Sequence, residues 1–103
     1  MTKYNAKRTY SELCQRWFDS MAEARVAEEL RLLELGREIY GLKYQVKFVL
    51  SEKPKVTIAI DFSYIEDKRR VYEDVKGVLT RDFRTKLAWL KDKYGIDVRL
   101  NYI

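Results

Sequence analysis

Two stretches decide the fold of this chain, Val56-Thr57-Ile58-Ala59-Ile60-Asp61 and Arg70-Val71-Tyr72-Glu73-Asp74-Val75-Lys76. Both are rich in β-branched and aromatic residues, a composition typical of β-strands. Side chains alternate between the two faces of a strand, so Asp74 and Lys76 project from one face, opposite to Val75. With Asp61 on the preceding strand, two carboxylates and an ammonium group are expected to lie together. Such an arrangement can hold a divalent cation beside a group that activates water.

Both aspartates also have an ordinary explanation, as the end of a strand at a surface turn or as part of a solvated strand face. Against the first, Phe62-Ser63-Tyr64 continue the strand pattern beyond Asp61. A carboxylate inside an apolar strand is costly to bury unless it is paired or bound to a metal. Against the second, the Asp-x-Lys triplet at 74–76 follows Asp61 at the spacing of a hairpin. The sequence therefore favours a functional site.

The remaining sequence predicts an α/β fold with the order α-β-β-β-α-β. Apolar residues at helical spacing predict a first helix whose buried stripe contains Ala22, Val26, Ala27, Leu30 and Leu33. Ser20 or Asp19 can cap its start, Gly36 can end it, and Thr80 and Gly95 bound a second helix. The helices are expected over 20–35 and 80–94, and the strands over 44–50, 56–64, 70–76 and 96–100.

We expect one domain over 1–103, with a core over 19–101 in which helices flank a mixed central sheet. Residues 1–18 form a basic, aromatic arm that is either a short hairpin or irregular.

Composition narrows the chemistry that this chain can perform. The 103 residues carry a net charge of +5 and include one cysteine and no histidine. Histidine-based catalysis and zinc sites are therefore excluded, and any catalysis must use carboxylates, lysines, hydroxyls or an oxygen-ligated metal. The positive charge favours an acidic polymer as partner. We expect a cytoplasmic protein, since the lone Cys14 suits a reducing compartment and no secretory signal or membrane span is apparent.

Several further residues are candidates for the site. Glu23 completes a Ser-x-x-Glu capping box with Ser20, yet it also faces the inner side of the helix, so both roles stay open. Gln45 is either a solvated strand residue or part of the site, where it would contact nucleic acid. The candidates for contact with nucleic acid are basic residues of the arm and of the second helix, each of which can equally be an ordinary surface charge: Lys7, Arg8, Arg81, Arg84 and Lys86.

The chain resembles the PD-(D/E)XK superfamily, which has a restriction-endonuclease-like fold, and within it small phage and prophage endodeoxyribonucleases described as Holliday-junction-resolvase-like. The resemblance covers about residues 18–97. It rests on Phe18-Asp19-Ser20, Glu23-Ala24, Gly36, Ile39, Leu42, Gln45, Phe48, Ala59-Ile60-Asp61-Phe62, Tyr64, Glu73-Asp74-Val75-Lys76-Gly77, Thr80, Phe83, Lys86 and Tyr94-Gly95-Ile96. Ile60 replaces the proline of the signature, and the segment before Phe18 lacks the Asp-Gly turn expected of the family.

The resemblance implies a nuclease of the phage or bacterial cytoplasm that uses Mg²⁺ or Mn²⁺ to hydrolyse DNA phosphodiesters, with branched DNA as the expected substrate. Asp61 and Asp74 would bind the metal with the Val75 carbonyl, and Glu23 would bind it directly or through water. Lys76 would orient or deprotonate the attacking water. Because a single site cuts one strand, we expect a homodimer.

Two alternatives from other classes stay open. One is a non-catalytic DNA-binding or phage-assembly adaptor that keeps the fold. The other is a basic interaction domain without nucleic acid.

Overall fold

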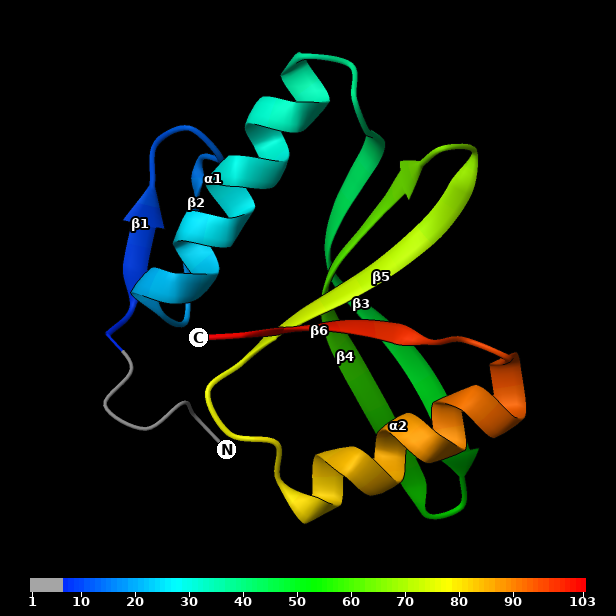
Figure 1. The fold of residues 1–103 in the computed structure, drawn as a ribbon. Coiled ribbons are helices and arrows are strands. Elements are labelled where there is room, and N and C mark those ends of the chain that lie inside the picture. The colour runs from blue at the N-terminus through cyan, green and yellow to red at the C-terminus, as the bar shows by residue number, and fades with distance from the viewer. Residues whose placement is uncertain (1–6) are drawn as a thin grey trace.

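A computed structural model describes residues 7–103, so the first six residues of the expected arm lie outside the described part. The chain forms a small hairpin, two helices and a four-stranded sheet (Figure 1). The elements are β1 (Thr9–Ser11), β2 (Arg16–Phe18), α1 (Met21–Leu35), β3 (Tyr40–Glu52), β4 (Lys55–Glu66), β5 (Arg69–Lys76), α2 (Arg81–Tyr94) and β6 (Val98–Tyr102).

The main sheet is mixed, as the sequence predicted. Its strand order is β3-β4-β5-β6. β3, β4 and β5 are antiparallel neighbours, whereas β6 runs parallel to β5. A parallel pair needs a crossover connection, which α2 provides. The α/β class and the order α-β-β-β-α-β are therefore confirmed for the part of the chain after the hairpin.

At the start of the chain the structure decides one open alternative and departs from one prediction. Of the two forms left open for the arm, residues 9–18 adopt the short hairpin, in which β1 and β2 pair over Thr9–Ser11 and Arg16–Phe18. β3 begins at Tyr40, four residues before the predicted strand. Its first residues were missed because the β3–β4 register is irregular between Tyr40 and Lys43, where Gly41 has a φ of 62°. Such a bulge breaks the alternation from which a strand is read.

Caps define the ends of both helices. Ser20 Oγ accepts from the Glu23 N–H at 3.1 Å, and Thr80 Oγ1 accepts from the Phe83 N–H at 3.2 Å. Gly95 ends α2 in the left-handed conformation that glycine adopts readily (φ 71°). These caps are as predicted. The predicted burial of Leu33 is wrong, because α1 buries Glu23, Ala24, Val26, Ala27 and Leu30 instead.

Two apolar clusters form the core, and β4 contributes to both. α1 packs on a cluster that includes Phe62 and Tyr64, whereas α2 packs through Leu90 on a cluster that includes Ile58 and Ile60. Figure 1 accordingly shows α1 and α2 over different ends of the sheet. Asp61 lies on β4 between the residues of the two clusters. Within residues 7–103, no helix is long and apolar enough to cross a bilayer.

Candidate active site

The candidate site lies where β4 and β5 separate, a point that we call the strand fork. β4 pairs with β5 only over 62–66, and the pairing stops at Phe62 and Glu73. Before that point β4 continues with β3 alone, while β5 continues with β6 through Lys76. Asp61 and Asp74 are the first residues beyond the last backbone pair, so both aspartates lie in the fork.

The two carboxylates replace the missing ladder bonds at the fork. The Asp61 N–H donates to Asp74 Oδ1 at 2.9 Å, and the Val75 N–H donates to Asp61 Oδ2 at 2.9 Å. Asp61 is 8% exposed and Asp74 is 1% exposed. Buried carboxylates are costly unless they have polar partners, and these bonds supply them. The fork is therefore a built feature that both side chains hold together.

Lys76 faces Asp74, as strand alternation predicted. Its Nζ lies 2.9 Å from Asp74 Oδ2 and 3.6 Å from the centroid of the Phe83 ring on α2. Lys76 is thus the charged partner of Asp74 Oδ2, and this buried oxygen has no further hydrogen-bond partner among residues 7–103. A carboxylate oxygen has more than one lone pair, so Oδ2 can accept a second positive charge besides the ammonium group.

Gln45 completes the row of polar side chains on β3, β4 and β5. Its Nε2 donates to Asp61 Oδ1 at 3.2 Å. Its φ is 51°, in the left-handed region that a glutamine rarely adopts. The regular pairs Tyr44–Phe62 and Val46–Ile60 flank it on either side. Such strain persists only where the surroundings impose it, and it is concentrated at functional sites.

Glu23 caps the start of α1, but it bonds a different backbone N–H from the one in the usual capping box. Its carboxylate accepts from the Asp19 N–H at 3.1 Å, one residue before the cap residue Ser20. It is 2% exposed. Glu23 also lines a cleft of about 280 Å³ together with Gln45; the other lining residues are Arg8, Arg16, Trp17, Phe18 and Asp19. The cleft therefore reaches the fork through Gln45.

The structure brings the carboxylates of Asp61 and Asp74 together, but the Glu23 carboxylate does not join them in one group. In the described residues 7–103, no three acidic or cysteine side chains form a group that could hold a metal. A direct metal bond from Glu23 thus has no support in the arrangement. Its predicted alternative, a contact through water across the cleft, is compatible with the position of Glu23 on the cleft wall.

The donor set at the fork fits a hard cation. The N–H and C=O of a residue in an extended strand point to the same edge. The Val75 N–H bonds Asp61, whereas the Lys76 carbonyl accepts from the Ile103 N–H at 3.1 Å on the other edge. The Val75 carbonyl therefore points toward the fork. Two carboxylates and a carbonyl are the oxygen ligands that Mg²⁺ and Mn²⁺ prefer.

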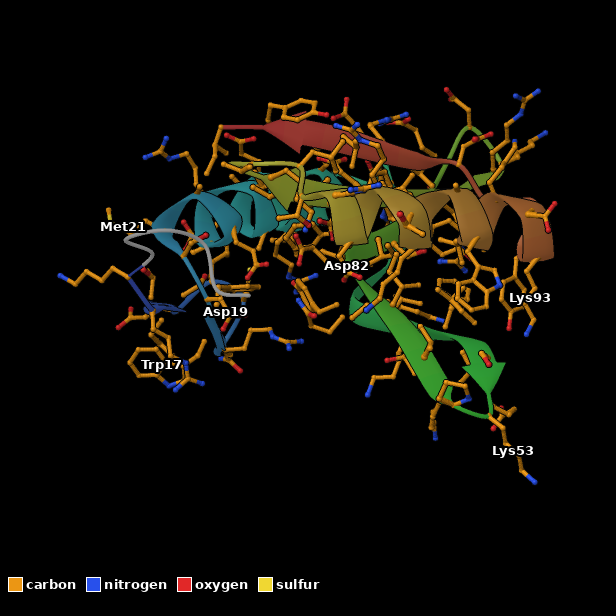
Figure 2. The ribbon with its side chains drawn as sticks, turned by 90° about the horizontal axis from the view of Figure 1, so that it is seen from below. Trp17, Asp19, Met21, Lys53, Asp82 and Lys93 are labelled. Carbon is orange, nitrogen blue, oxygen red and sulfur yellow. The ribbon has the colours of Figure 1, made fainter. Side chains whose placement is uncertain are left out.

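The basic candidates divide into two groups. Arg8 lines the cleft and is exposed. Away from the cleft lining, Lys7 on the arm and Arg81 and Arg84 on α2 are exposed, and Lys86 forms an ion pair with Asp82 at 3.6 Å. Figure 2 shows Asp82 on α2, well separated from Trp17 and Asp19 at the hairpin end of the molecule.

The cleft residues Arg16 and Trp17 were missed among the sequence candidates. Arg16 lines the cleft, with its guanidinium carbon 4.5 Å from the centroid of Tyr44 and 5.6 Å from that of Phe18. The available signal for Arg16 was its position two residues before the apolar Phe18, which puts both side chains on one face of a strand. That signal is unreadable while residues 9–18 are not assigned as a hairpin.

The chain belongs to the protein family described as "Protein of unknown function (DUF1064)", whose model matches residues 1–103. No curated protein matches the chain. No solved structure matches it either.

Proposed function

We propose that this protein is a metal-dependent endodeoxyribonuclease that hydrolyses DNA phosphodiesters. The main support is the strand fork, where the buried carboxylates of Asp61 and Asp74 lie together and the Lys76 ammonium group is 2.9 Å from Asp74 Oδ2. The resemblance of these residues to the PD-(D/E)XK signature points the same way.

Asp61, Asp74 and the Val75 carbonyl would hold Mg²⁺ or Mn²⁺. The bound ion would lower the pKa of a coordinated water and stabilise negative charge on the phosphate. Lys76 would orient the attacking water or accept its proton, because its ammonium group lies beside the ligand Asp74. Glu23 would act across the cleft through water. The guanidinium groups of Arg8 and Arg16 would attract the DNA backbone to the cleft.

Within this class, we propose branched DNA as the substrate and phage DNA metabolism as the setting. Both come from the resemblance to Holliday-junction-resolvase-like enzymes. Symmetric cleavage of a four-way junction requires two sites, so a homodimer is part of the proposal.

A second candidate is a DNA-binding adaptor without catalysis. The hydrogen bonds at the fork favour this candidate. Asp61 and Asp74 each accept a backbone N–H, so the fold alone is a sufficient reason for both carboxylates. Under this candidate the basic side chains around the cleft bind DNA, but nothing is cut.

Nicking of supercoiled plasmid by the purified protein tests the proposal. We expect relaxed circles in Mg²⁺ or Mn²⁺ and none in excess EDTA, with activity restored when the metal is replaced. Salt-sensitive retention of intact plasmid in both conditions would contradict the nuclease and support the adaptor.

A further inference from the structure

The exposed face of the β1–β2 hairpin carries two aromatic rings with no role in the core. Tyr10 and Trp17 are direct partners in the register. Their ring centroids lie 5.3 Å apart in an edge-to-face arrangement, and the Arg8 guanidinium lies 5.2 Å from the Trp17 centroid. Tyr10 is 46% exposed and Trp17 is 52% exposed. We call these three side chains the aromatic platform.

The opposite face of the hairpin holds the platform in place. Ser11 is 1% exposed and Phe18 is 4% exposed. Ser11 Oγ donates to Glu28 Oε2 on α1 at 2.6 Å and accepts from the Cys14 N–H at 3.1 Å. The platform is therefore pre-organised, which lowers the entropy lost when a ligand binds.

Two of the three platform residues line the cleft described above. Arg8 and Trp17 line it together with Gln45, which donates to Asp61 in the strand fork. Figure 2 shows Trp17 on the hairpin, at the outer edge of the molecule. A ligand that spans this cleft from the platform reaches Gln45, the hydrogen-bond partner of Asp61.

Arg16 adds a second guanidinium group to the cleft lining. Its side chain stacks 4.5 Å from the Tyr44 centroid, and its buried Nε has no hydrogen-bond partner among residues 7–103. The parallel N–H donors of a guanidinium group match the oxygens of a phosphate. A cation for the phosphate beside a ring for the base is the pattern of single-strand recognition.

We propose that the aromatic platform stacks on an unpaired nucleobase, so that the DNA cut by this protein carries unpaired nucleotides beside the scissile phosphodiester. This inference rests on the proposed function and narrows its substrate class. In continuous duplex both faces of each base are covered by neighbours. An exposed ring therefore distinguishes branch points, flaps and gaps, where a base is accessible, from paired DNA.

Binding measured in EDTA tests the platform independently of cleavage. The two probes are DNAs of equal length, one fully paired and one with a short unpaired segment. The parental protein is expected to prefer the second probe. Trp17→Ala is expected to weaken binding to that probe roughly 5- to 100-fold while changing duplex binding little. Trp17→Phe retains a ring and most of the preference, and Trp89→Ala, at the exposed tryptophan of α2, is the matched control.

A second measurement follows the fluorescence of Trp17 and needs only the conservative substitution Trp89→Phe. In the Trp89→Phe protein the remaining tryptophan fluorescence comes from Trp17, and it should be quenched on binding of the unpaired probe far more than on binding of duplex. Three results would each overturn the proposed role of the platform. They are the absence of quenching, equal affinity of the parental protein for both probes, and an equal loss of affinity for both probes in Trp17→Ala.

The outcomes separate this inference from the nuclease proposal. Cleavage without any preference for the unpaired probe contradicts the platform and leaves the nuclease. A preference that Trp17→Ala removes, in a protein that never cuts, supports the platform as a DNA contact and contradicts the nuclease.

Discussion

The carboxylates of Asp61 and Asp74 have two roles: they accept hydrogen bonds from the backbone, and they are the candidate metal ligands. Each accepts one N–H bond across the fork, and such charged bonds contribute about 1.5–3 kcal/mol. An alanine at either position would therefore weaken the fold as well as remove a metal ligand. Asparagine keeps one oxygen acceptor and is the better probe of function.

Glu23→Gln separates the helix cap from the site. The glutamine oxygen can still accept the Asp19 N–H, so the free energy of unfolding should change by less than about 1 kcal/mol. Glutamine lacks the charge needed to act toward a metal through water, so nicking should fall at least about tenfold. Denaturant unfolding and plasmid nicking measure the two effects. Glu29→Gln, at an exposed position of α1, is the control, and equal nicking by both variants would leave only the cap.

Lys76→Met tests the ammonium group and keeps much of the aliphatic contact with Phe83. Because lysine donates and does not bind Mg²⁺ while charged, the rate at saturating metal should fall by roughly 100-fold or more, with little change in the metal concentration needed. Single-turnover nicking across a Mg²⁺ titration checks this. Lys91→Met, whose lysine pairs with exposed Asp97, should behave as the parental protein. A normal rate with weakened metal dependence would remove Lys76 from the chemistry.

At the scale of single residues, local rules predicted much of the arrangement. Alternation along a strand was enough to bring Asp74 to Lys76, and capping rules found Ser20 and Thr80. The same rules are silent on Gln45, whose left-handed φ depends on the neighbouring strand. They also cannot give the distance between Glu23 and the aspartates, because that distance depends on how α1 packs on the sheet.

The elements around the site are distorted where they meet it. β4 leaves β5 beyond Phe62, whereas β3 and β4 keep one register on either side of Gln45 and Asp61 despite the positive φ of Gln45. Residues opposite each other on antiparallel strands project from the same face, so this register places Gln45 beside Asp61. The register and the fork together explain why three neighbouring strands present Gln45, Asp61 and Asp74 together.

Glycine and alanine at position 45 should show whether β3 is strained there. Glycine relieves the positive φ, so Gln45→Gly is expected to be about 1 kcal/mol more stable to denaturant than Gln45→Ala. At exposed Lys47 of the same strand the order should reverse, because glycine normally weakens a strand. Both changes at Gln45 should slow nicking, since both remove the bond to Asp61. If the alanine variant is more stable to denaturant than the glycine variant at both positions, the backbone of β3 is not strained at Gln45.

A polar cluster on the other face of the sheet ties β4, β5 and β6 together. Tyr64 Oη donates to Glu73 Oε1 at 2.5 Å, and Asn101 Nδ2 donates to Glu73 Oε2 at 3.0 Å. Burial, and then the bond to Glu73, raises the pKa of Tyr64 above its ordinary value. Glu73 is thus a structural residue, although it neighbours Asp74.

Tyr64→Phe should lower the free energy of unfolding by about 1–3 kcal/mol at neutral pH, because buried Glu73 loses a donor. The folded pKa lies above the unfolded one, so the contribution of the phenol is complete below about pH 10 and is lost as the pH rises further. The difference between the two proteins should therefore be constant from about pH 7 to 9 and shrink above about pH 10. Unfolding curves across this range provide the measurement. A difference that grows with pH would contradict the assignment.

Element order was predictable because both helices and the later strands keep regular periods. The hairpin stayed one of two alternatives, because its strands have three residues each and offer too few positions to show alternation. The early part of β3 was hidden by its irregular register.

At the scale of the whole molecule, separate parts of the chain converge on one cleft. The hairpin supplies Arg8, Arg16 and Trp17, α1 supplies Glu23, and β3 connects them through Gln45 to the fork. A net charge of +5 suits a polyanionic partner. Neither the cleft nor the stacked Arg16 was predictable from the sequence, because both depend on how the hairpin docks on the sheet.

Single-turnover plasmid nicking in Mg²⁺ by Asp74→Asn and by Asp92→Asn, at an exposed aspartate of α2, tests the central claim most directly. Circular dichroism and thermal unfolding first establish that both variants are folded. If the strand fork is a metal-dependent nuclease site, Asp92→Asn nicks at the parental rate while Asp74→Asn loses at least about 1000-fold and still binds DNA. Nicking by folded Asp74→Asn within a few-fold of the parental rate would contradict the account.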